Sequence, residues 1–332
     1  MEFLSSAPCK AILFGEHYVV YGSPALAIAI EPRNSVKFSE GKGGITLLTV
    51  FGEGRIVSDG AYSGPAELKA YSEVAKEIFG NGDVPSCTVE FTSGWNLKGV
   101  GASASFCAAF AAGLLKLAGK KPSAEEIFAA AQAGDQFAHG GRASGIDAKT
   151  VSFGLPLIFQ RSFDPPVFKS KPTEFSLPSG SALLLIDTFK GKKDGTSAML
   201  ETFAREFGIN KPPQELQVGA REAVIAEFAP LWEKISKSLG NATAKELGEL
   251  MNQNHALLKT RGMSSRGIET AVSAALSSGA YGAKLTGGGG EGGAVLALFE
   301  KKGIARAMKE ISDETGFGCH LISLAKKGAR ID

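Results

Sequence analysis

A Gly-rich segment at residues 98–105 has the composition of a phosphate-binding loop. It follows a predicted strand at residues 87–91 and precedes a helix expected at about residues 106–117. Bare backbone can approach phosphate oxygens closely, and a helix N-terminus supplies unpaired N–H groups and a positive dipole end. A tight strand-to-helix turn would also explain the glycines, so the segment alone leaves both interpretations open. Its residues are Lys98, Gly99, Val100, Gly101, Ala102, Ser103, Ala104 and Ser105.

Two familiar nucleotide-binding motifs can be compared with this segment. No Gly-x4-Gly-Lys-Ser/Thr pattern occurs in the chain, which excludes a P-loop. Gly99, Gly101 and Ala104 fit a relaxed dinucleotide-binding fingerprint, and Glu125 follows roughly 20 residues later. Because several other segments precede it, where a Rossmann domain would normally begin, an NAD(P)-binding oxidoreductase is kept only as the alternative.

Two more segments carry residues suited to chemistry. Residues 284–293 contain six glycines in ten positions, and ordering so many glycines has a high entropic cost. A loop that brings backbone close to a ligand explains this run better than a flexible hairpin does. Near the N-terminus, Glu16 and His17 adjoin Gly15 at the end of a predicted strand, where polar ligand-binding groups often gather.

The elements around these segments predict an α+β fold. Apolar runs indicate strands at residues 11–14, 25–30, 87–91, 183–186, 294–298 and 320–324, and helical spacing indicates helices at 68–79, 197–208, 214–239, 243–260 and 303–315. The helix at 106–117 is apolar nearly all round, which predicts a buried position. Ser123 and Glu126 form a capping-box pattern that begins another helix. Strands and helices alternate irregularly, and a Pro-rich stretch at 165–178 is the expected boundary.

Composition excludes several classes of protein. The 332 residues carry 36 basic and 34 acidic side chains, a net charge of +2, and the basic residues cluster only in pairs, which argues against nucleic-acid binding. An apolar fraction of 44% argues against disorder. No stretch reaches 18 apolar residues and no signal peptide is visible. The four cysteines show no framework spacing, so we expect a cytoplasmic protein.

The three segments together resemble, in order, the three motifs of the GHMP kinase superfamily, which includes galactokinase, homoserine kinase, mevalonate kinase and phosphomevalonate kinase. Residues 8–22 resemble most closely the mevalonate kinase pattern PGKxxLFGEHxVVYG, with Cys9 in place of the usual Gly. Residues 143–147 resemble the superfamily's PSGID segment, and residues 251–258 its MNxNHxLL helix. Five ordered matches over most of the chain identify the sequence as a member of this superfamily.

The resemblance implies a catalytic pair and a substrate pocket. Asp147 takes the position of the catalytic Asp that accepts the proton of the substrate hydroxyl, and Lys10 matches the Lys that stabilises the charges beside it. Residues 98–105 would bind the triphosphate of ATP. The positions that match the substrate pocket, or would close over it, are Glu16, His17, Thr196, Gly287 and Gly288.

The resemblance identifies the metal ligands less directly than the catalytic pair. Ser103 matches the serine that reaches Mg²⁺. The acidic ligand of the family lies eleven residues before the catalytic Asp, and counting back from Asp147 without gaps gives the neutral Gln136. We favour Asp135, because the glycines at 140–141 allow a one-residue shift. Otherwise Ser103, waters and phosphates would hold the ion.

By resemblance, the expected activity is phosphorylation of mevalonate to 5-phosphomevalonate with ATP and Mg²⁺, in isoprenoid precursor synthesis. Alternatives are a kinase for another small alcohol, such as phosphomevalonate or the 3-hydroxyl of mevalonate, and a sensor that has lost catalysis. The implied fold has an N-terminal domain like ribosomal protein S5 domain 2 at residues 1–168 and a ferredoxin-like C-terminal domain at 169–332. A homodimer without nucleic-acid or membrane partners is expected.

Overall fold

The structure is a computed structural model that describes residues 2–57, 59–80, 82–95, 97, 99–141, 143–164, 166–191 and 194–332. Its strands are β1 (Phe3–Phe14), β2 (Ala25–Glu40), β3 (Ile45–Thr49), β4 (Gly52–Ile56), β5 (Tyr62–Ser63), β6 (Cys87–Thr92), β7 (Leu157–Phe163), β8 (Pro166–Pro172), β9 (Ser181–Asp187), β10 (Gly282–Thr286), β11 (Ala294–Glu300), β12 (Gly318–Leu324) and β13 (Arg330–Ile331). Its α-helices are α1 (Lys69–Phe79), α2 (Ala102–Leu117), α3 (Ala124–Ala138), α4 (Ile146–Phe153), α5 (Thr196–Glu206), α6 (Val218–Ser238), α7 (Ala244–Thr260), α8 (Arg266–Ser277) and α9 (Ile304–Thr315). Short 3₁₀ helices occur at Tyr18–Tyr21, Ala66–Leu68 and Pro213–Glu215.

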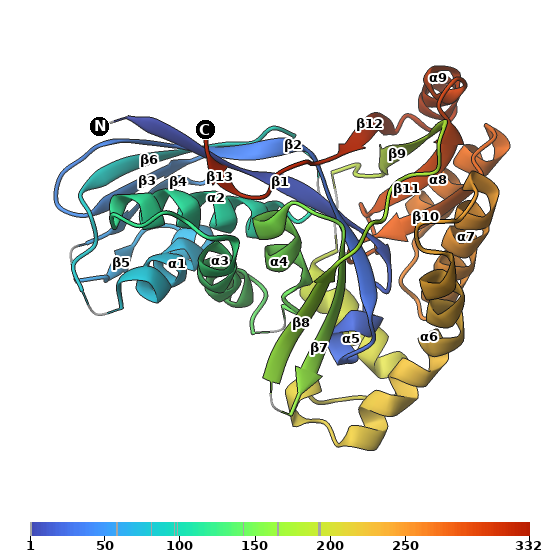
Figure 1. The fold of residues 1–332 in the computed structure, drawn as a ribbon, viewed down its shortest axis with the longest axis horizontal. Coiled ribbons are helices and arrows are strands. Elements are labelled where there is room, and N and C mark those ends of the chain that lie inside the picture. The colour runs from blue at the N-terminus through green and yellow to red at the C-terminus, as the bar shows by residue number, and fades with distance from the viewer. Residues whose placement is uncertain are drawn as a thin grey trace.

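A single sheet runs through both halves of the molecule. Its main path has the order β10-β11-β9-β12-β2-β6-β3-β4-β5, with β1 and β7 also paired to β2. The two halves join where β12 pairs with β2, with Ser323 opposite Glu31. Helices α1–α4 pack beside the β1–β6 half, and α7–α9 pack beside β9–β12 (Figure 1). The α+β prediction is confirmed.

Helix α2 is the central element of the N-terminal half. Its buried apolar side chains confirm the position predicted for it. Gly113 allows the ring of Phe38 on β2 to pack against the helix, because a Cβ at this glycine would lie 2.1 Å from the ring. The helix begins four residues earlier than predicted, at Ala102, because Gly101 caps it with a φ of 69°. The predicted capping box of Ser123 and Glu126 is confirmed at the start of α3.

Part of the Pro-rich stretch predicted as the domain boundary is a strand. Residues 166–172 form β8, which pairs antiparallel with β7 alone, and prolines are compatible with such an edge position. The predicted domain boundary between residues 168 and 169 lies inside this strand. The C-terminal residues also return to the N-terminal half, where β13 pairs with β1 (Figure 1).

The dinucleotide-binding alternative is wrong on topology. A Rossmann domain is built from parallel βαβ units. Among the described strands, the parallel pairing is between β3 and β6, and the strand that follows α2–α4, β7, pairs antiparallel with β2 and β8. Helices α4 and α8 were not predicted; α4 is only 8 residues long.

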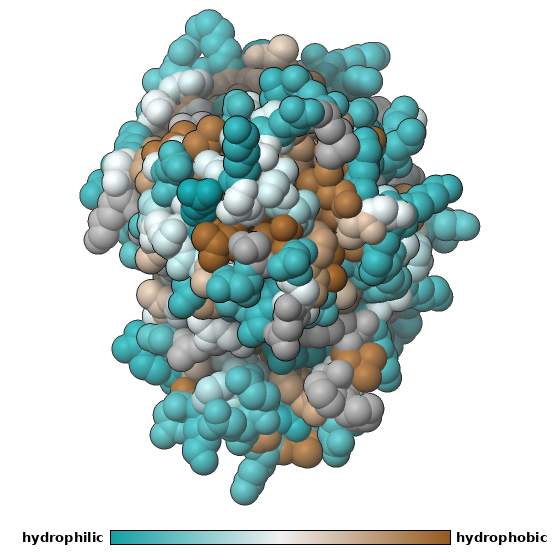
Figure 2. Space-filling model, turned by 90° about the vertical axis from the view of Figure 1, so that its left-hand side faces the viewer, coloured by the Kyte–Doolittle hydropathy of each residue, from teal (hydrophilic) through white to brown (hydrophobic). Residues whose placement is uncertain are grey.

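The end of the molecule that carries β3–β5 and α1 has a largely hydrophilic outline, with hydrophobic side chains gathered nearer its middle (Figure 2). In the part of the chain that the structure describes, no helix has both the length and the apolar character needed to span a bilayer.

Candidate active site

A cavity of about 280 Å³ lies where the two halves of the molecule meet. Its wall is formed by β1, the start of α2, the end of α3, the start of α4, the start of α5 and the loop after β10. Most of the residues predicted from the motifs line it: Lys10, His17, Gly99, Gly101, Ala102, Ser103, Asp135, Asp147, Thr196, Gly287 and Gly288.

Lys10 and Asp147 form an ion pair at this wall. Lys10 Nζ lies 3.1 Å from Asp147 Oδ1, with the lysine side chain 3% and the aspartate side chain 24% exposed. Lys10 lies on β1, and Asp147 lies in the first turn of α4, where the helix dipole favours a negative charge. Gly101 makes room for the pair, since a Cβ there would lie 2.8 Å from Lys10 Cγ. Asp147 therefore presents a carboxylate to the cavity beside a buried cation.

The loop before α2 presents bare backbone to the cavity. Gly99 and Gly101 both have positive φ angles, and α2 begins without a side-chain cap. This loop touches the second Gly-rich loop, because a Cβ on Gly287 would lie 2.8 Å from the Gly99 carbonyl oxygen. The N–H groups of the first turn of α2 and the Ser103 side chain therefore form an anion-binding end of the cavity.

Some residues of this loop do not line the cavity. Ser105 is fully buried, and its hydroxyl donates to the Ala7 carbonyl oxygen at 3.0 Å. Val100 and Ala104 are buried in the two apolar cores, and the Val100 carbonyl accepts a hydrogen bond from the Lys10 N–H at 2.9 Å. Their part in ATP binding would be to support the loop. Lys98 lies outside the described residues.

Asp135, and not Gln136, lies on the cavity wall. Gln136 turns away and donates from Nε2 to the Ala143 carbonyl oxygen at 2.8 Å. His139 Nδ1 lies 3.2 Å from Asp135 Oδ1 and 2.9 Å from the Asp135 carbonyl oxygen. Burial lowers the pKa of His139, but the contacts with the Asp135 carboxylate outweigh it and raise the pKa to about 9. The one-residue shift considered for the acidic ligand agrees with this geometry.

The residues present fit a magnesium ion. Asp135 brings a carboxylate to the cavity wall, and its Oδ1 accepts no regular hydrogen bond from the described residues besides the ion-pair contact with His139, so the carboxylate can still bind a cation. Ser103 lines the same cavity and offers a hydroxyl oxygen. Within the described residues there is no cluster of three His, Cys, Asp or Glu side chains, so a cation here would rely on phosphate and water oxygens for its other ligands.

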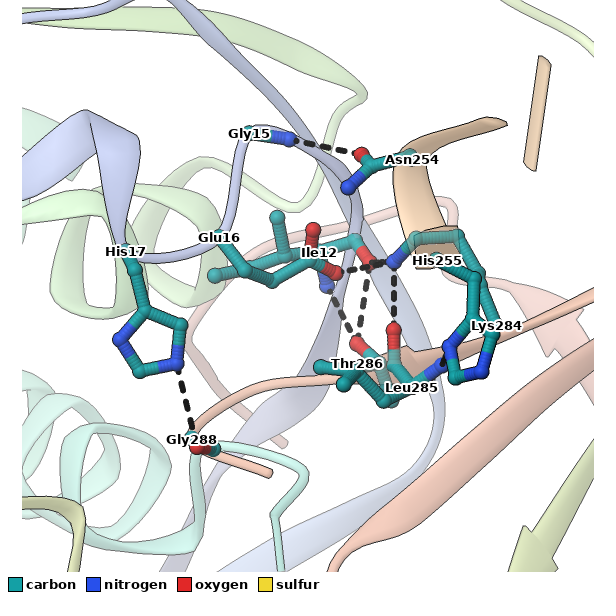
Figure 3. A network of polar contacts seen from close by, with 10 residues as sticks. All are labelled: Ile12, Gly15, Glu16, His17, Asn254, His255, Lys284, Leu285, Thr286 and Gly288. Atoms are coloured by element: carbon teal, nitrogen blue, oxygen red, sulfur yellow. Dashed lines mark hydrogen bonds and ion pairs between the residues drawn. The ribbon is translucent and has the colours of Figure 1, made fainter. Parts of the chain in front are cut away.

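Glu16 lies behind the cavity rather than on its wall. Its carboxylate forms an ion pair with Lys284 on β10, and both side chains are fully buried (Figure 3). Burial raises the pKa of Glu16 and lowers that of Lys284, and the attraction between the two opposes both shifts. Lys284 also donates to the Leu285 carbonyl oxygen at 2.5 Å. The pair joins the turn after β1 to the strand that carries the second Gly-rich loop.

His17 is the polar side chain of this turn that reaches the cavity. Its Nε2 donates to the Gly288 carbonyl oxygen at 3.1 Å (Figure 3). Its ring stacks on Phe203 of α5 with centroids 5.1 Å apart. Burial lowers the pKa of His17 to about 4, so the ring is neutral at pH 7. Nδ1 has no partner among the described residues and remains an acceptor.

Further hydrogen bonds join β1 to α7 and β10 (Figure 3). Thr286 Oγ1 donates to the Ile12 carbonyl oxygen at 2.9 Å and accepts from the Ile12 N–H at 3.1 Å. Asn254 accepts from the Gly15 N–H at 3.2 Å. Lys284 and Thr286 have no predicted role from the sequence, although they lie directly before the glycine run in the same motif. That position was the signal that could have identified them.

Comparison with known proteins places the chain in a family. Residues 235–315 match the family described as GHMP kinases C terminal. A mevalonate kinase of Thermococcus gammatolerans is 31% identical over all of this chain and 99% of its own length. The chain belongs to the mevalonate kinase family of GHMP kinases. A second member, the mevalonate kinase of Pyrococcus horikoshii, is 32% identical over 92% of each chain.

Solved structures show the same fold at lower sequence identity. The crystal structure of the Methanococcus jannaschii mevalonate kinase superposes with a TM-score of 0.76, covers 98% of this chain and 99% of its own, and is 19% identical. The GHMP kinase fold predicted from the motifs is confirmed. The cavity between the two Gly-rich loops is therefore the candidate active site of this chain.

Proposed function

We propose that this protein transfers the γ-phosphoryl group of ATP to the 5-hydroxyl of mevalonate and so makes 5-phosphomevalonate, an isoprenoid precursor. The observation that carries the proposal is the Lys10–Asp147 ion pair in a cavity whose other end is the start of α2, where no side chain accepts from the helix N–H groups. Full-length similarity to mevalonate kinases supports the choice of substrate. A carboxylate beside an anion-binding end is the arrangement that phosphoryl transfer to an alcohol requires.

In the proposed reaction the substrate hydroxyl oxygen attacks the γ-phosphorus while the bond to the β,γ-bridging oxygen breaks and ADP leaves. Asp147 accepts the hydroxyl proton, because its carboxylate is the exposed member of the pair. Lys10 is buried against it and stabilises negative charge on the attacking oxygen and the phosphoryl group. The backbone of residues 99–104 binds the phosphates and holds the γ-phosphorus in line with the hydroxyl.

Asp135 and Ser103 would hold Mg²⁺. When bound, the ion would neutralise negative charge on the phosphate groups of ATP. His139 supports Asp135, because an imidazolium 3.2 Å from Oδ1 fixes the carboxylate next to the cavity.

The substrate side of the cavity offers neutral polar groups. His17 Nδ1 is an acceptor suited to a substrate hydroxyl, and Thr196 adds a hydroxyl at the start of α5. We propose that these two side chains and the backbone at Gly287 and Gly288 orient mevalonate. Glu16 does not contact mevalonate and contributes by its buried ion pair with Lys284.

The test is coupled ADP release with Mg-ATP and each of four alcohols: mevalonate, phosphomevalonate, galactose and homoserine. We expect turnover on mevalonate with kcat/KM at least a hundredfold above the other three, since a site built for one hydroxyl pattern rejects others strongly. Turnover on a different alcohol would replace the proposed substrate. ATP binding with no turnover on any of the four would favour a sensor.

We also propose a cytoplasmic homodimer whose N-terminal domain carries the catalytic pair and whose C-terminal domain begins near residue 169. The four cysteines are free thiols, three of them buried, which supports a reducing compartment. Light scattering of the purified protein gives the oligomeric state directly, and a monomer mass would contradict the dimer.

A further inference from the structure

The phenol of Tyr18 is held by two charged side chains from the C-terminal half. Its hydroxyl donates to Glu227 Oε2 of α6 at 2.8 Å. Arg261, which caps α7, donates to the same carboxylate from Nη2 at 2.6 Å and from Nε at 3.0 Å. The hydrogen bond with Glu227 in turn raises the pKa of Arg261. A charged carboxylate fixed by an arginine on two nitrogens is a strong and directional acceptor for a phenol.

The Tyr18 ring is fixed as firmly as its hydroxyl. It stacks on Phe228 of α6 with centroids 5.0 Å apart and meets Phe203 of α5 edge-on at the same distance. Phe203 also stacks on His17. Arg261 extends this cluster, since its guanidinium lies 4.2 Å from the centroid of the Phe207 ring on α5's C-terminal side. Phe203 of α5 therefore contacts both the Tyr18 ring and the His17 ring.

His17 needs such support because its backbone is strained. Its φ is 61°, the one positive value among the described non-glycine residues. The left-handed conformation is unfavourable for a side chain with a Cβ and persists where the surroundings hold it. The two neighbours of His17 are both anchored: Glu16 by Lys284 and Tyr18 by Glu227.

We propose that Tyr18, Glu227 and Arg261 form a positioning device that holds the His17 ring in its cavity-facing orientation and thereby sets the affinity for the alcohol substrate. The proposal rests on the function proposed above. Glu227 and Arg261 do not line the cavity, so they act through Tyr18 and touch neither substrate.

Kinetics of Tyr18→Phe give the first test. The substitution removes the hydroxyl and keeps the ring that packs on Phe203 and Phe228. We expect KM for the alcohol to rise about tenfold, the effect of losing one hydrogen bond to a charged acceptor, with KM for ATP within twofold of the wild type. Tyr62→Phe is the matched control, because it removes a hydrogen-bonded phenol hydroxyl beside β5, away from the cavity.

The charged pair gives the second test. Glu227→Gln keeps an acceptor for Tyr18 but loses the ion pair, and Arg261→Lys keeps the charge but loses the two-nitrogen contact. We expect both variants to raise KM for the alcohol less than Tyr18→Phe does, and the double variant Tyr18→Phe/Glu227→Gln to equal Tyr18→Phe alone. Arg306→Gln, which breaks the exposed ion pair with Glu310 on α9, is the control for lost charge.

A third readout needs no substrate. Long-range ¹H–¹⁵N spectra of the four histidines report which ring nitrogen carries the proton. In the wild type, His17 should remain the Nε2–H tautomer at pH 6, as its contact with Gly288 requires. In Tyr18→Phe its signals should shift or broaden, while those of His255 and His320 stay in place.

These measurements separate the inference from the proposed function. If the protein prefers another alcohol, the KM comparison is made with that alcohol, and the histidine spectrum stands in either case. An unchanged His17 spectrum in Tyr18→Phe would overturn the inference. So would an equal rise of KM for both substrates, or a fall in thermal midpoint with neither KM changed, because each indicates a purely structural role.

Discussion

Asp147 and Lys10 differ sharply in exposure, and this difference supports the roles proposed for them. The carboxylate is about a quarter exposed to the cavity, whereas the ammonium is almost completely buried beneath it. An incoming hydroxyl can therefore reach the carboxylate but meets the lysine only as a nearby fixed charge. Such a fixed charge needs no reorganisation during the reaction, which is how preorganised electrostatics lower a barrier.

Removing the charge of Asp147 tests its role as proton acceptor. In Asp147→Asn we expect kcat to fall by about 10²–10⁴, the usual contribution of a general base. ATP binding should be kept, so saturating Mg-ATP at about 100 times its Kd should still stabilise the variant by about 2.7 kcal/mol. Coupled ADP release and thermal unfolding measure the two quantities. A kcat within a few-fold of the wild type would remove Asp147 from this role.

The metal assignment predicts different effects for two neighbouring residues. Asp135→Asn should raise the Mg²⁺ concentration needed for half-maximal activity, because a neutral amide binds a hard cation more weakly than a carboxylate does. Gln136→Ala should leave that concentration nearly unchanged, since Gln136 hydrogen-bonds the Ala143 backbone instead. Mg²⁺ titrations after treatment with a chelator give both values. A larger effect of Gln136→Ala than of Asp135→Asn would instead favour Gln136, the position that lies eleven residues before Asp147.

The buried His17 predicts a dependence of stability on pH. Its pKa is about 4 in the folded protein and about 6.5 when unfolded. The unfolded chain therefore binds more protons between these values, and stability is lost as the pH falls through 6.5 toward 4. Between pH 7.5 and 5.0 the wild type should lose about 2 kcal/mol more than His17→Gln in urea unfolding. His320→Gln, outside the cavity, is the control, and equal losses in all three proteins would contradict this account.

Single residues were predicted unevenly from the sequence. Lys10, Ser103 and Asp147 lie on the cavity wall because their motif positions are tied to the backbone turns that the glycines form. Glu16 and Ser105 carry the right chemistry, but tertiary contacts turn both inward, to Lys284 and to the Ala7 carbonyl. No local pattern encodes those partners, which lie 268 and 98 residues away.

At the level of elements, β1 contacts both Gly-rich loops: the Lys10 N–H donates to the Val100 carbonyl oxygen of the first loop, and Ile12 bonds Thr286, which directly precedes the second. Thr286 exchanges two hydrogen bonds with Ile12, and the Glu16–Lys284 pair lies alongside them. These contacts form one joint between residues 8–22 and residues 284–293. The two Gly-rich loops touch at Gly99 and Gly287, and a Cβ on Gly287 would lie 2.8 Å from the Gly99 carbonyl oxygen.

Breaking this joint should destabilise the fold. Lys284→Met leaves the Glu16 carboxylate buried without its partner, and the free energy of unfolding should fall by about 3–5 kcal/mol. Lys309→Met breaks an exposed ion pair with Asp313 on α9 and should leave the free energy of unfolding nearly unchanged. Urea unfolding at pH 7 measures both. Equal effects of the two substitutions would show that the buried pair contributes no more than a surface contact.

Elements with strong local signals were predicted well. The apolar composition of α2 and the Ser123–Glu126 capping box define their helices within the sequence itself. Strand β8 was not predicted because prolines usually indicate the end of a helix or strand. It forms an edge strand only through its pairing with β7, which is information that the residues of β8 alone do not contain. The short helix α4 has little periodicity to detect.

At the scale of the whole molecule, the continuous sheet explains why the active site can be built from residues far apart in the chain. Strand β2 pairs with both β1 and β12, and β13 returns to β1, so the halves are joined by several strands rather than by a hinge. Lys10, Asp147 and Gly288 then converge on one cavity. The order of the motifs predicted that they belong together, but not this continuity.

We expect this cavity to transfer the phosphoryl group to the 5-hydroxyl of mevalonate. We would test it first by ¹H-coupled ³¹P NMR of the product formed from Mg-ATP and mevalonate. We expect a phosphomonoester signal split into a triplet, because carbon 5 carries two protons. An unsplit signal, from phosphate on the tertiary 3-oxygen, would contradict it, as would ADP formation with no phosphomonoester from mevalonate.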